Sequence, residues 1–195
     1  MFIELTDHLR CLADHPESYL VLLPDEVRER SVRTGRLGCP VCGRTYTLAD
    51  GVLDFGGGQT ELPARTLLTA EALTALVGLS GPGGYMVIVG TPGAEWREVA
   101  RRNQGVGLIA VNPPPSVVDE PGISVLRAGA IPLKSRSMRG VALGSPFGGD
   151  PTWVGEAARV VLPGLRVAGE GPVPDSGTLE LMAAAGGAWV GTPRR

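Results

Sequence analysis

The chain of 195 residues carries a formal net charge of −2, and hydrophobic residues make up 43% of it. Such a composition supports a buried core, which excludes a disordered polypeptide, and the near-neutral charge gives no general reason to expect nucleic-acid binding. No apolar run is long enough to cross a bilayer and the first residues lack the features of a secretory signal, so we expect a cytoplasmic protein without membrane contact. All three cysteines lie within the first 42 residues, and in a reducing compartment such a cluster indicates a metal site more than a disulfide.

Two short segments each predict half of a metal site. Cys39 and Cys42 form a C-x-x-C knuckle, and upstream Cys11 and His15 form a C-x3-H pair. Zinc prefers four ligands in a tetrahedron, so these four residues are predicted to hold one structural zinc ion with no open position for catalysis. His8, three residues before Cys11, remains an alternative fourth ligand if that segment is helical.

The residues around these ligands predict a small β-rich module. Residues 19–23 and 32–37 are expected to form a hairpin, and residues 45–48 and 52–55 flank an Asp-Gly dipeptide that is favoured in tight turns. So short a segment can hardly bury its own core, so we expect its folding to depend on the metal. Residues 1–55 contain six Arg against nine Asp and Glu, a net charge of −3 that disfavours an RNA-binding role.

Three stretches of this module carry a family resemblance: Leu9-Arg10-Cys11, the ten residues from Leu37 to Tyr46, and Asp50-Gly51-Val52. They resemble the small zinc-ribbon proteins that activate tRNA, rRNA and protein methyltransferases. The chain departs from that pattern at His15, which replaces the second cysteine of the first knuckle with one extra spacer residue, and at Thr47, where proline is usual. The resemblance implies a zinc ribbon over residues 1–55.

Beyond the ribbon, a glycine-rich stretch at residues 56–60 predicts a flexible joint, with a linker over residues 56–68 and a second domain over residues 69–195. The apolar pattern of that domain alternates between helix and strand. Helices are expected at 69–79, 95–102, 152–161 and 179–185, and strands at 85–90, 106–111, 123–126, 140–143, 165–168 and 188–190. This alternation predicts an α/β fold with a doubly wound, mostly parallel sheet.

The strand at residues 85–90 followed by Gly93, the segment Ile131-Pro132-Leu133, and the stretch from Glu156 to Gly164 resemble the class I S-adenosylmethionine-dependent methyltransferases. The resemblance implies a Rossmann-like methyltransferase domain. It also implies that the sheet is truncated at its C-terminus, where the family usually has a further antiparallel strand.

The residues that would bind the cofactor depart from the family pattern. The glycine loop is Gly90-Thr91-Pro92-Gly93, in which the proline has no N–H and a fixed φ. Asn112 stands where an acidic residue would grip the ribose hydroxyls, and it lacks the charge that strengthens such a bond. The resemblance therefore implies that Gly90, Gly93 and Asn112 are vestigial or weak cofactor-binding residues, and no catalytic residue is assigned.

Two functions follow as hypotheses. The first is a zinc-binding, methyltransferase-like pseudoenzyme that acts as a scaffold through a protein partner or a second copy of itself. The alternative is an active methyltransferase that uses S-adenosylmethionine to modify RNA or a small molecule. The sequence leaves open whether the protein is an enzyme, although the cofactor residues favour the first hypothesis.

Overall fold

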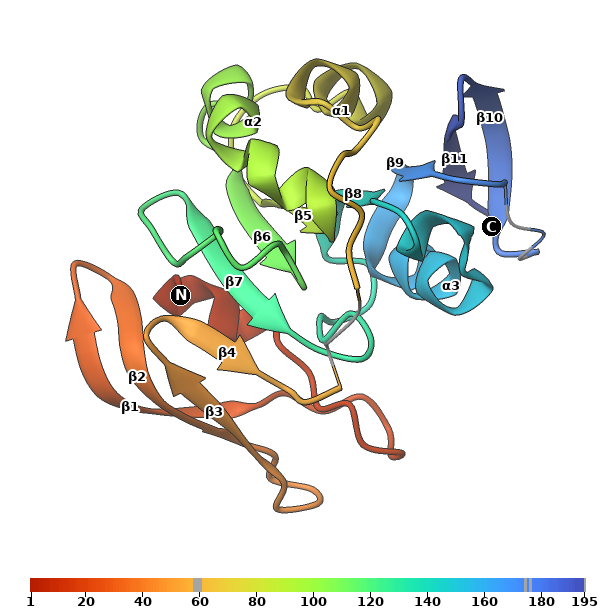
Figure 1. Cartoon of the computed structure of the whole chain (residues 1–195). Coiled ribbons are helices and arrows are strands. Elements are labelled where there is room, and N and C mark those ends of the chain that lie inside the picture. Colours follow the sequence, from red (N-terminus) through yellow and green to blue (C-terminus); the bar gives the residue numbers. More distant parts are fainter. Residues whose placement is uncertain (58–60, 174, 176, 195) are drawn as a thin grey trace.

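The computed structural model describes residues 1–57, 61–173, 175 and 177–194. Within these residues one mixed sheet of eleven strands extends from β1 at one edge to β10 at the other (Figure 1). The strand order is β1-β2-β3-β4-β7-β6-β5-β8-β9-β11-β10. The sheet thus includes strands from both the N-terminal and the C-terminal parts of the chain.

The first four strands are antiparallel and follow one another in the sequence: β1 (Val21–Arg28), β2 (Ser31–Gly38), β3 (Thr45–Ala49) and β4 (Val52–Asp54). β4 then pairs in parallel with β7 (Ile123–Arg127), with Val52 opposite Val125 and Asp54 opposite Arg127. Backbone hydrogen bonds therefore join the predicted ribbon to the rest of the sheet.

The central strands are parallel: β6 (Gly107–Val111), β5 (Tyr85–Val89), β8 (Met138–Leu143) and β9 (Val161–Glu170). β5, β6 and β8 are almost entirely buried, whereas β9 is buried only at its first residue and over its last four. The continuous apolar sequences of β5 and β6 fit this position, because a parallel strand at the centre of a sheet is covered on both faces. Two core clusters lie on opposite faces of these strands.

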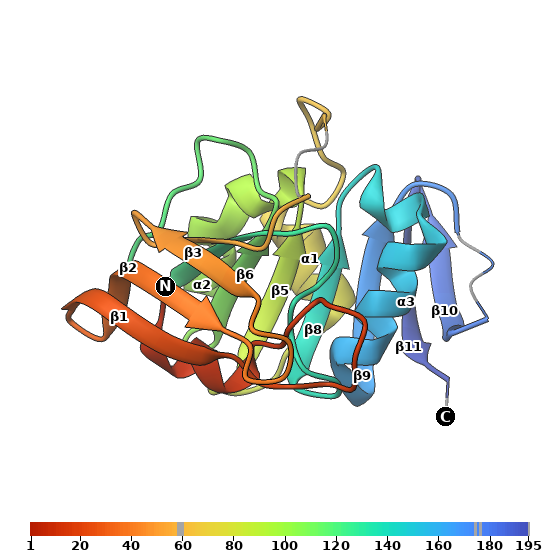
Figure 2. The same cartoon turned by 90° about the horizontal axis from the view of Figure 1, so that it is seen from below.

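In the described part of the chain, three α-helices and three short 3-10 helices cover the sheet. They are η1 (Ile3–His8), α1 (Ala70–Val77), η2 (Thr91–Glu95), α2 (Trp96–Arg102), η3 (Phe147–Gly149) and α3 (Pro151–Val160). The hydroxyl of Thr69 caps α1 by accepting a hydrogen bond from the N–H of Ala72, and the Asp150 carboxylate caps α3 in the same way. α1 and α2 lie on one face of the sheet, whereas α3 and the N-terminal segment lie on the other (Figures 1 and 2).

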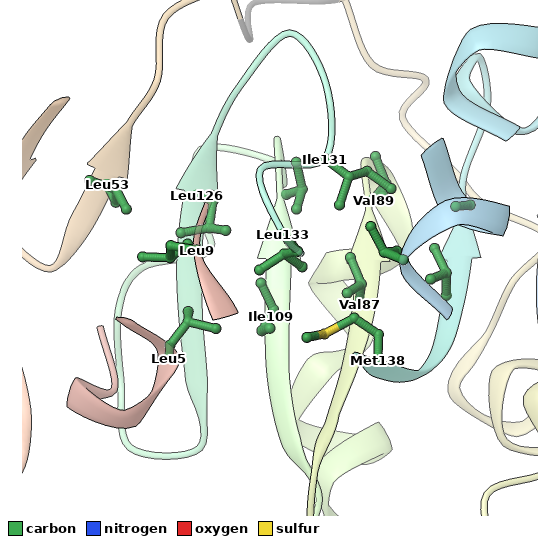
Figure 3. Packing of buried hydrophobic residues seen from close by; sticks show 14 of the residues in the cluster. Leu5, Leu9, Leu53, Val87, Val89, Ile109, Leu126, Ile131, Leu133 and Met138 are labelled. Atoms are coloured by element: carbon green, nitrogen blue, oxygen red, sulfur yellow. The ribbon is translucent and has the colours of Figure 1, made fainter. Parts of the chain in front are cut away.

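On the face covered by α3, the N-terminal residues pack into the core. Leu5 and Leu9 pack with Leu126, Ile109 and Leu133 in one buried cluster, shown in Figure 3. The α-amino group of Met1 is also buried, 2.6 Å from the Asp119 carboxylate, which contacts Arg33 at 2.8 Å on its other oxygen.

The C-terminal hairpin completes the sheet. β11 (Ala188–Pro193) pairs antiparallel with β9, and β10 (Leu179–Ala185) pairs antiparallel with β11. The apolar pattern predicts a helix at residues 179–185, and this is wrong: they form strand β10. Pairing with β11 outweighs the intrinsic helix preference of leucine and alanine, which amounts to only a fraction of a kcal/mol per residue.

The predicted fold class is also wrong, because strand pairings that the sequence pattern does not indicate decide the architecture. We expected a doubly wound, Rossmann-like methyltransferase sheet, truncated at its C-terminus and preceded by a separate small ribbon. Instead five of the ten strand pairings are antiparallel, and helices occupy only about a fifth of the described residues. The ribbon strands extend the sheet at one side, and a hairpin of β11 and β10 extends it at the other.

The division into residues 1–55, 56–68 and 69–195 remains a prediction about independent folding units. The glycine joint at residues 56–60 lies partly outside the described residues. Among the described residues, no helix is both long enough and apolar enough to span a membrane.

Candidate metal centre

Cys11 and His15 lie in a loop that directly follows η1. The loop is closed by an isolated antiparallel bridge between Arg10 and Tyr19, and the N–H of Cys11 donates to the carbonyl of Ser18 at 3.1 Å. The N–H of His15 donates to the carbonyl of Ala13 at 2.9 Å, which tightens the tip of the loop. The backbone therefore holds both side chains on one short, closed loop.

Cys39 and Cys42 lie in the turn between β2 and β3. The N–H of Cys39 donates to the carbonyl of Arg44 at 2.8 Å, and the N–H of Gly43 donates to the carbonyl of Cys39 at 2.9 Å. Gly43 has a φ of 71°, a left-handed conformation that glycine adopts without steric cost. This tight turn brings the two thiols of the C-x-x-C motif to the same side.

The two turns meet, and the four predicted ligands come together. Their ligand atoms all lie within 4.8 Å of one another, a group that could hold a metal ion. Cys11 Sγ is 3.7 Å from Cys42 Sγ, and His15 Nε2 is 3.4 Å from Cys39 Sγ. Cys11 and Cys39 are buried, His15 is half-buried and Cys42 is exposed.

His8, the alternative ligand, lies outside this group. Its ring packs edge-on against Tyr85, with the two centroids 5.3 Å apart, and its Nδ1 is buried without a hydrogen-bond partner among the described residues. Burial, and then the positive charge of Lys134, lower the pKa of its imidazole. The helical segment that would have turned His8 towards the cysteines instead turns it towards β5.

Two hydrogen bonds orient the ligands from behind. The Tyr46 hydroxyl lies 3.1 Å from Cys11 Sγ and accepts the N–H of Leu12 at 3.3 Å, which leaves its own proton free to point at the sulfur. His15 Nδ1 lies 2.7 Å from the carbonyl of Pro16. A proton on Nδ1 would complete that bond and leave the lone pair of Nε2 directed at the cysteines.

Hydrogen bonds also lower the pKa of the two buried cysteines. Burial alone would raise the pKa of the Cys39 thiol, but the backbone N–H groups of Cys42 and Val41 outweigh it and lower the pKa to about 6. For Cys11 burial is likewise outweighed, by the Tyr46 hydroxyl and the N–H of Ala13, and its pKa is also lowered. At both buried cysteines the pKa is thus shifted in the direction of the thiolate, the form that binds metals.

A charged network anchors the first loop to the body of the protein. Arg10 contacts Glu156 of α3 at 3.1 Å, and Glu156 also contacts Arg159 at 2.8 Å. Glu17, at the far side of the loop, accepts hydrogen bonds from the N–H and hydroxyl of Ser135 at 3.1 and 2.9 Å. The position of the metal loop is therefore fixed against α3 and the segment before β8.

Gly90 and Gly93, the first two predicted cofactor residues, lie between β5 and α2, and their surroundings are filled by the protein itself. Gly90 has a φ of 78°, and a Cβ atom there would lie 2.9 Å from the ring of Phe147. A Cβ atom at Gly93 would lie 3.0 Å from Pro113. Both glycines thus permit close packing of the chain upon itself.

Asn112, the third predicted cofactor residue, follows β6 and is buried. Its Nδ2 donates to the carbonyl of Ala128 at 2.7 Å, and its Oδ1 accepts the N–H of Ala128 at 2.9 Å. The carboxamide therefore ties the end of β6 to the segment after β7. A groove of about 580 Å³ beside it is lined mainly by prolines and small aliphatic residues: Leu62, Pro63, Ala64, Ala94, Pro113, Pro114 and Pro115, with Thr91, Asn112, Ser116 and Arg127 as its polar members.

Comparisons with known proteins add little to this geometry. No protein-family model and no curated protein matches the chain. Among solved structures, a putative hemolysin from Streptococcus thermophilus is similar to 66% of this chain and 53% of its own, at 15% sequence identity and a TM-score of 0.38. The chain thus spans about half the length of that structure, and a likeness this low says nothing about function.

Proposed function

We propose that Cys11, His15, Cys39 and Cys42 hold one zinc ion. Two distances between ligand atoms carry this proposal. Zinc binds sulfur at about 2.3 Å and histidine nitrogen at about 2.0 Å, so the edges of its tetrahedron are about 3.8 Å between two sulfurs and about 3.5 Å between sulfur and nitrogen. The corresponding distances here are 3.7 Å for Cys11 to Cys42 and 3.4 Å for Cys39 to His15.

The ligand types favour zinc among the common metals. Three thiolates and one imidazole suit zinc, whereas calcium and magnesium prefer oxygen ligands. The resemblance of residues 37–46 to zinc-ribbon proteins supports the same metal. Because four protein ligands complete the tetrahedron, no position remains for a water or a substrate, and the zinc is structural.

On this basis we propose that the protein is a non-catalytic scaffold whose N-terminal part is folded by zinc. Both histidines of the chain lie within its first 15 residues, so residues 69–195 contain no Ser–His or Cys–His pair for nucleophilic catalysis. The metal fastens the loop after η1 to the turn between β2 and β3, and these strands extend the sheet away from its centre. A structure fixed in this way suits a protein that acts by binding another.

The two histidines offer a matched test. Purified full-length protein is expected to contain one zinc per chain, measured by elemental analysis, and its cobalt-substituted form should show the intense visible absorption of tetrahedral cobalt bound to thiolates. His15→Ala should weaken zinc binding and change that spectrum. His8→Ala removes the same side chain outside the site, and it should leave both unchanged.

Two results would contradict the proposal. One is a zinc-free protein in which β1 to β4 are fully folded. The other is a loss of zinc in His8→Ala with none in His15→Ala, which would assign the fourth ligand to the other histidine.

The alternative function, an active methyltransferase, has no observation in its favour among the described residues. The amide of Asn112 is engaged by Ala128, and Phe147 and Pro113 fill the space beside the two glycines. We therefore propose the scaffold function alone.

A further inference from the structure

The two edges of the sheet differ in how well they are protected against pairing with another strand. An edge strand exposes unpaired N–H and C=O groups, and proteins commonly blunt such edges with proline, charged residues or bulges. β1 forms one edge and β10 forms the other. Both strands carry exposed apolar side chains, so the two edges differ in their prolines, charged residues and bulges.

β1 has all three kinds of protection. It contains Pro24, it carries the charged residues Asp25, Glu26 and Arg28, and its pairing with β2 is irregular on either side of Glu26. These features interrupt the regular row of hydrogen-bonding groups. Its exposed side chains, of which Leu23 is 57% exposed, lie on an edge that is poorly suited to continuous pairing.

β10 has less of this protection. Its sequence is Leu-Glu-Leu-Met-Ala-Ala-Ala, with no proline and a single charge at Glu180. Six of its seven residues are exposed, including Leu181 at 49% and Met182 at 52%. One irregularity in the pairing with β11, between Leu181 and Ala183, is the only interruption in the described strand.

We propose that the outer edge of β10 pairs with β10 of a second copy of this chain. The order of side chains supports a second copy as the occupant, because the large residues occupy the first half of the strand and alanines the second half. In an antiparallel pair centred on Met182, Leu181 faces Ala183 of the other copy, and Glu180 faces Ala184. Leu179, Glu180 and Leu181 then each meet an alanine, Met182 meets its own symmetry mate, and no like charges face each other.

The direction of the neighbouring strands fits the same arrangement. β9, β11 and β10 are already antiparallel, so an antiparallel copy of β10 continues the pattern of the hairpin. Such a pair has two-fold symmetry, which is the commonest symmetry of soluble oligomers. The dimer buries both exposed edges at once and leaves β1 of each copy at the outside.

The test is the mass of the zinc-loaded full-length protein, measured by light scattering after size exclusion from about 1 to about 100 µM. We expect a dimer. Met182→Lys places two like charges opposite each other at the two-fold axis, and it should raise the dimer dissociation constant by about a hundredfold or more. Leu23→Lys puts the same charge on the other edge and should leave the dimer unchanged.

Opposite charges at position 182 distinguish a variant that has lost the dimer interface from one that has failed to fold. Met182→Glu alone should also be monomeric, but an equimolar mixture of Met182→Lys and Met182→Glu should form a heterodimer. Zinc content should be unchanged in all these variants, so failure here is distinct from failure of the metal proposal. A monomeric wild-type protein over the whole range, an unaffected dimer in Met182→Lys, or a mixture that stays monomeric would each overturn the inference.

Discussion

The candidate metal centre and the loops after β5 and β6 both contain short polar motifs, but only in the first do the polar atoms point at a common site. In the metal centre, three sulfurs and one ring nitrogen from two separate turns converge within 4.8 Å of one another. In the loops that follow β5 and β6, the polar and flexible residues are already engaged. Asn112 is bonded to Ala128 through both ends of its amide, and the space beside Gly90 is filled by Phe147.

This difference separates a binding site from a structural motif. A site that binds a ligand keeps lone pairs or donors directed at a common point, whereas a structural motif satisfies them within the chain. At the metal centre the supporting bonds, from Tyr46 and from the carbonyl of Pro16, reach the ligands from behind. They orient the ligand atoms and leave them available to a metal.

Removal of zinc should have the largest effect and should affect only one of the two regions. Structural zinc contributes on the order of 10 kcal/mol in small zinc modules, so chelation should release much of the order in β2 and β3. Hydrogen exchange measures this directly. The amides of Leu37 and Tyr46 should lose protection, while those of Val87 and Ile109 in the central strands should keep it.

The matched sample is the same protein with the chelator saturated by zinc beforehand, which should exchange as the untreated protein does. Equal loss of protection in β3 and β5 would mean that the metal stabilises the whole sheet. No loss in either would mean that the four residues need no metal to hold their positions.

The local parts of this structure were accessible from the sequence, and the non-local parts were not. The C-x-x-C spacing, the Asp-Gly turn and the apolar runs of β5 and β6 depend on neighbouring residues, so their patterns indicate the elements directly. The pairing of β4 with β7 joins residues 52–54 to residues 125–127, and no local pattern encodes it. For the same reason no local pattern indicates that the ribbon strands and the central strands share one sheet.

β10 and Asn112 show two further limits. The apolar pattern of residues 179–185 predicts a helix, but their pairing with β11 makes them a strand. From the sequence, Asn112 resembles a weakened ribose ligand. Its actual partner is the backbone of Ala128, 16 residues away in the segment after β7, and no local pattern indicates that bond. For the candidate metal site the sequence offers few choices, because the chain has only three cysteines and two histidines.

Asn112→Asp tests the structural role of that residue, with the second largest expected effect. An aspartate keeps the acceptor for the N–H of Ala128 but presents an oxygen to its carbonyl, where a donor is needed, inside a buried site. We expect the free energy of unfolding to fall by about 2–4 kcal/mol, measured by urea denaturation. Asn112→Gly suits the local φ of 50° without supplying either bond, and it should also destabilise the protein. Unchanged stability in both variants would show that the bonds of Asn112 to Ala128 have no structural role.

Tyr46→Phe tests the support of the metal and should have a smaller effect. The ring of Phe can keep the contact with Phe55, whose centroid lies 4.5 Å from that of Tyr46, while the bond to Cys11 is lost. Zinc affinity should fall by about tenfold, measured by competition with a chromophoric chelator, and the cobalt–thiolate absorption should shift. Tyr85→Phe, which removes a hydroxyl far from the cysteines, should change neither. A spectrum that does not shift in Tyr46→Phe would show that the hydroxyl has only a packing role.

The last prediction is an absence of binding: calorimetric titration of the protein with S-adenosylmethionine should show no heat of binding. The groove beside Asn112 offers mostly prolines and aliphatic side chains, and the one amide there is already bonded to Ala128. Asn112→Asp is the informative partner, because it places at this position an acidic residue of the kind that binds the ribose hydroxyls in methyltransferases. If Asn112 is structural, neither the wild-type protein nor the variant should release heat with millimolar cofactor. Binding that appears or tightens in Asn112→Asp would show instead that the region keeps a cofactor site, weakened at one residue, and the two regions would then differ in degree only.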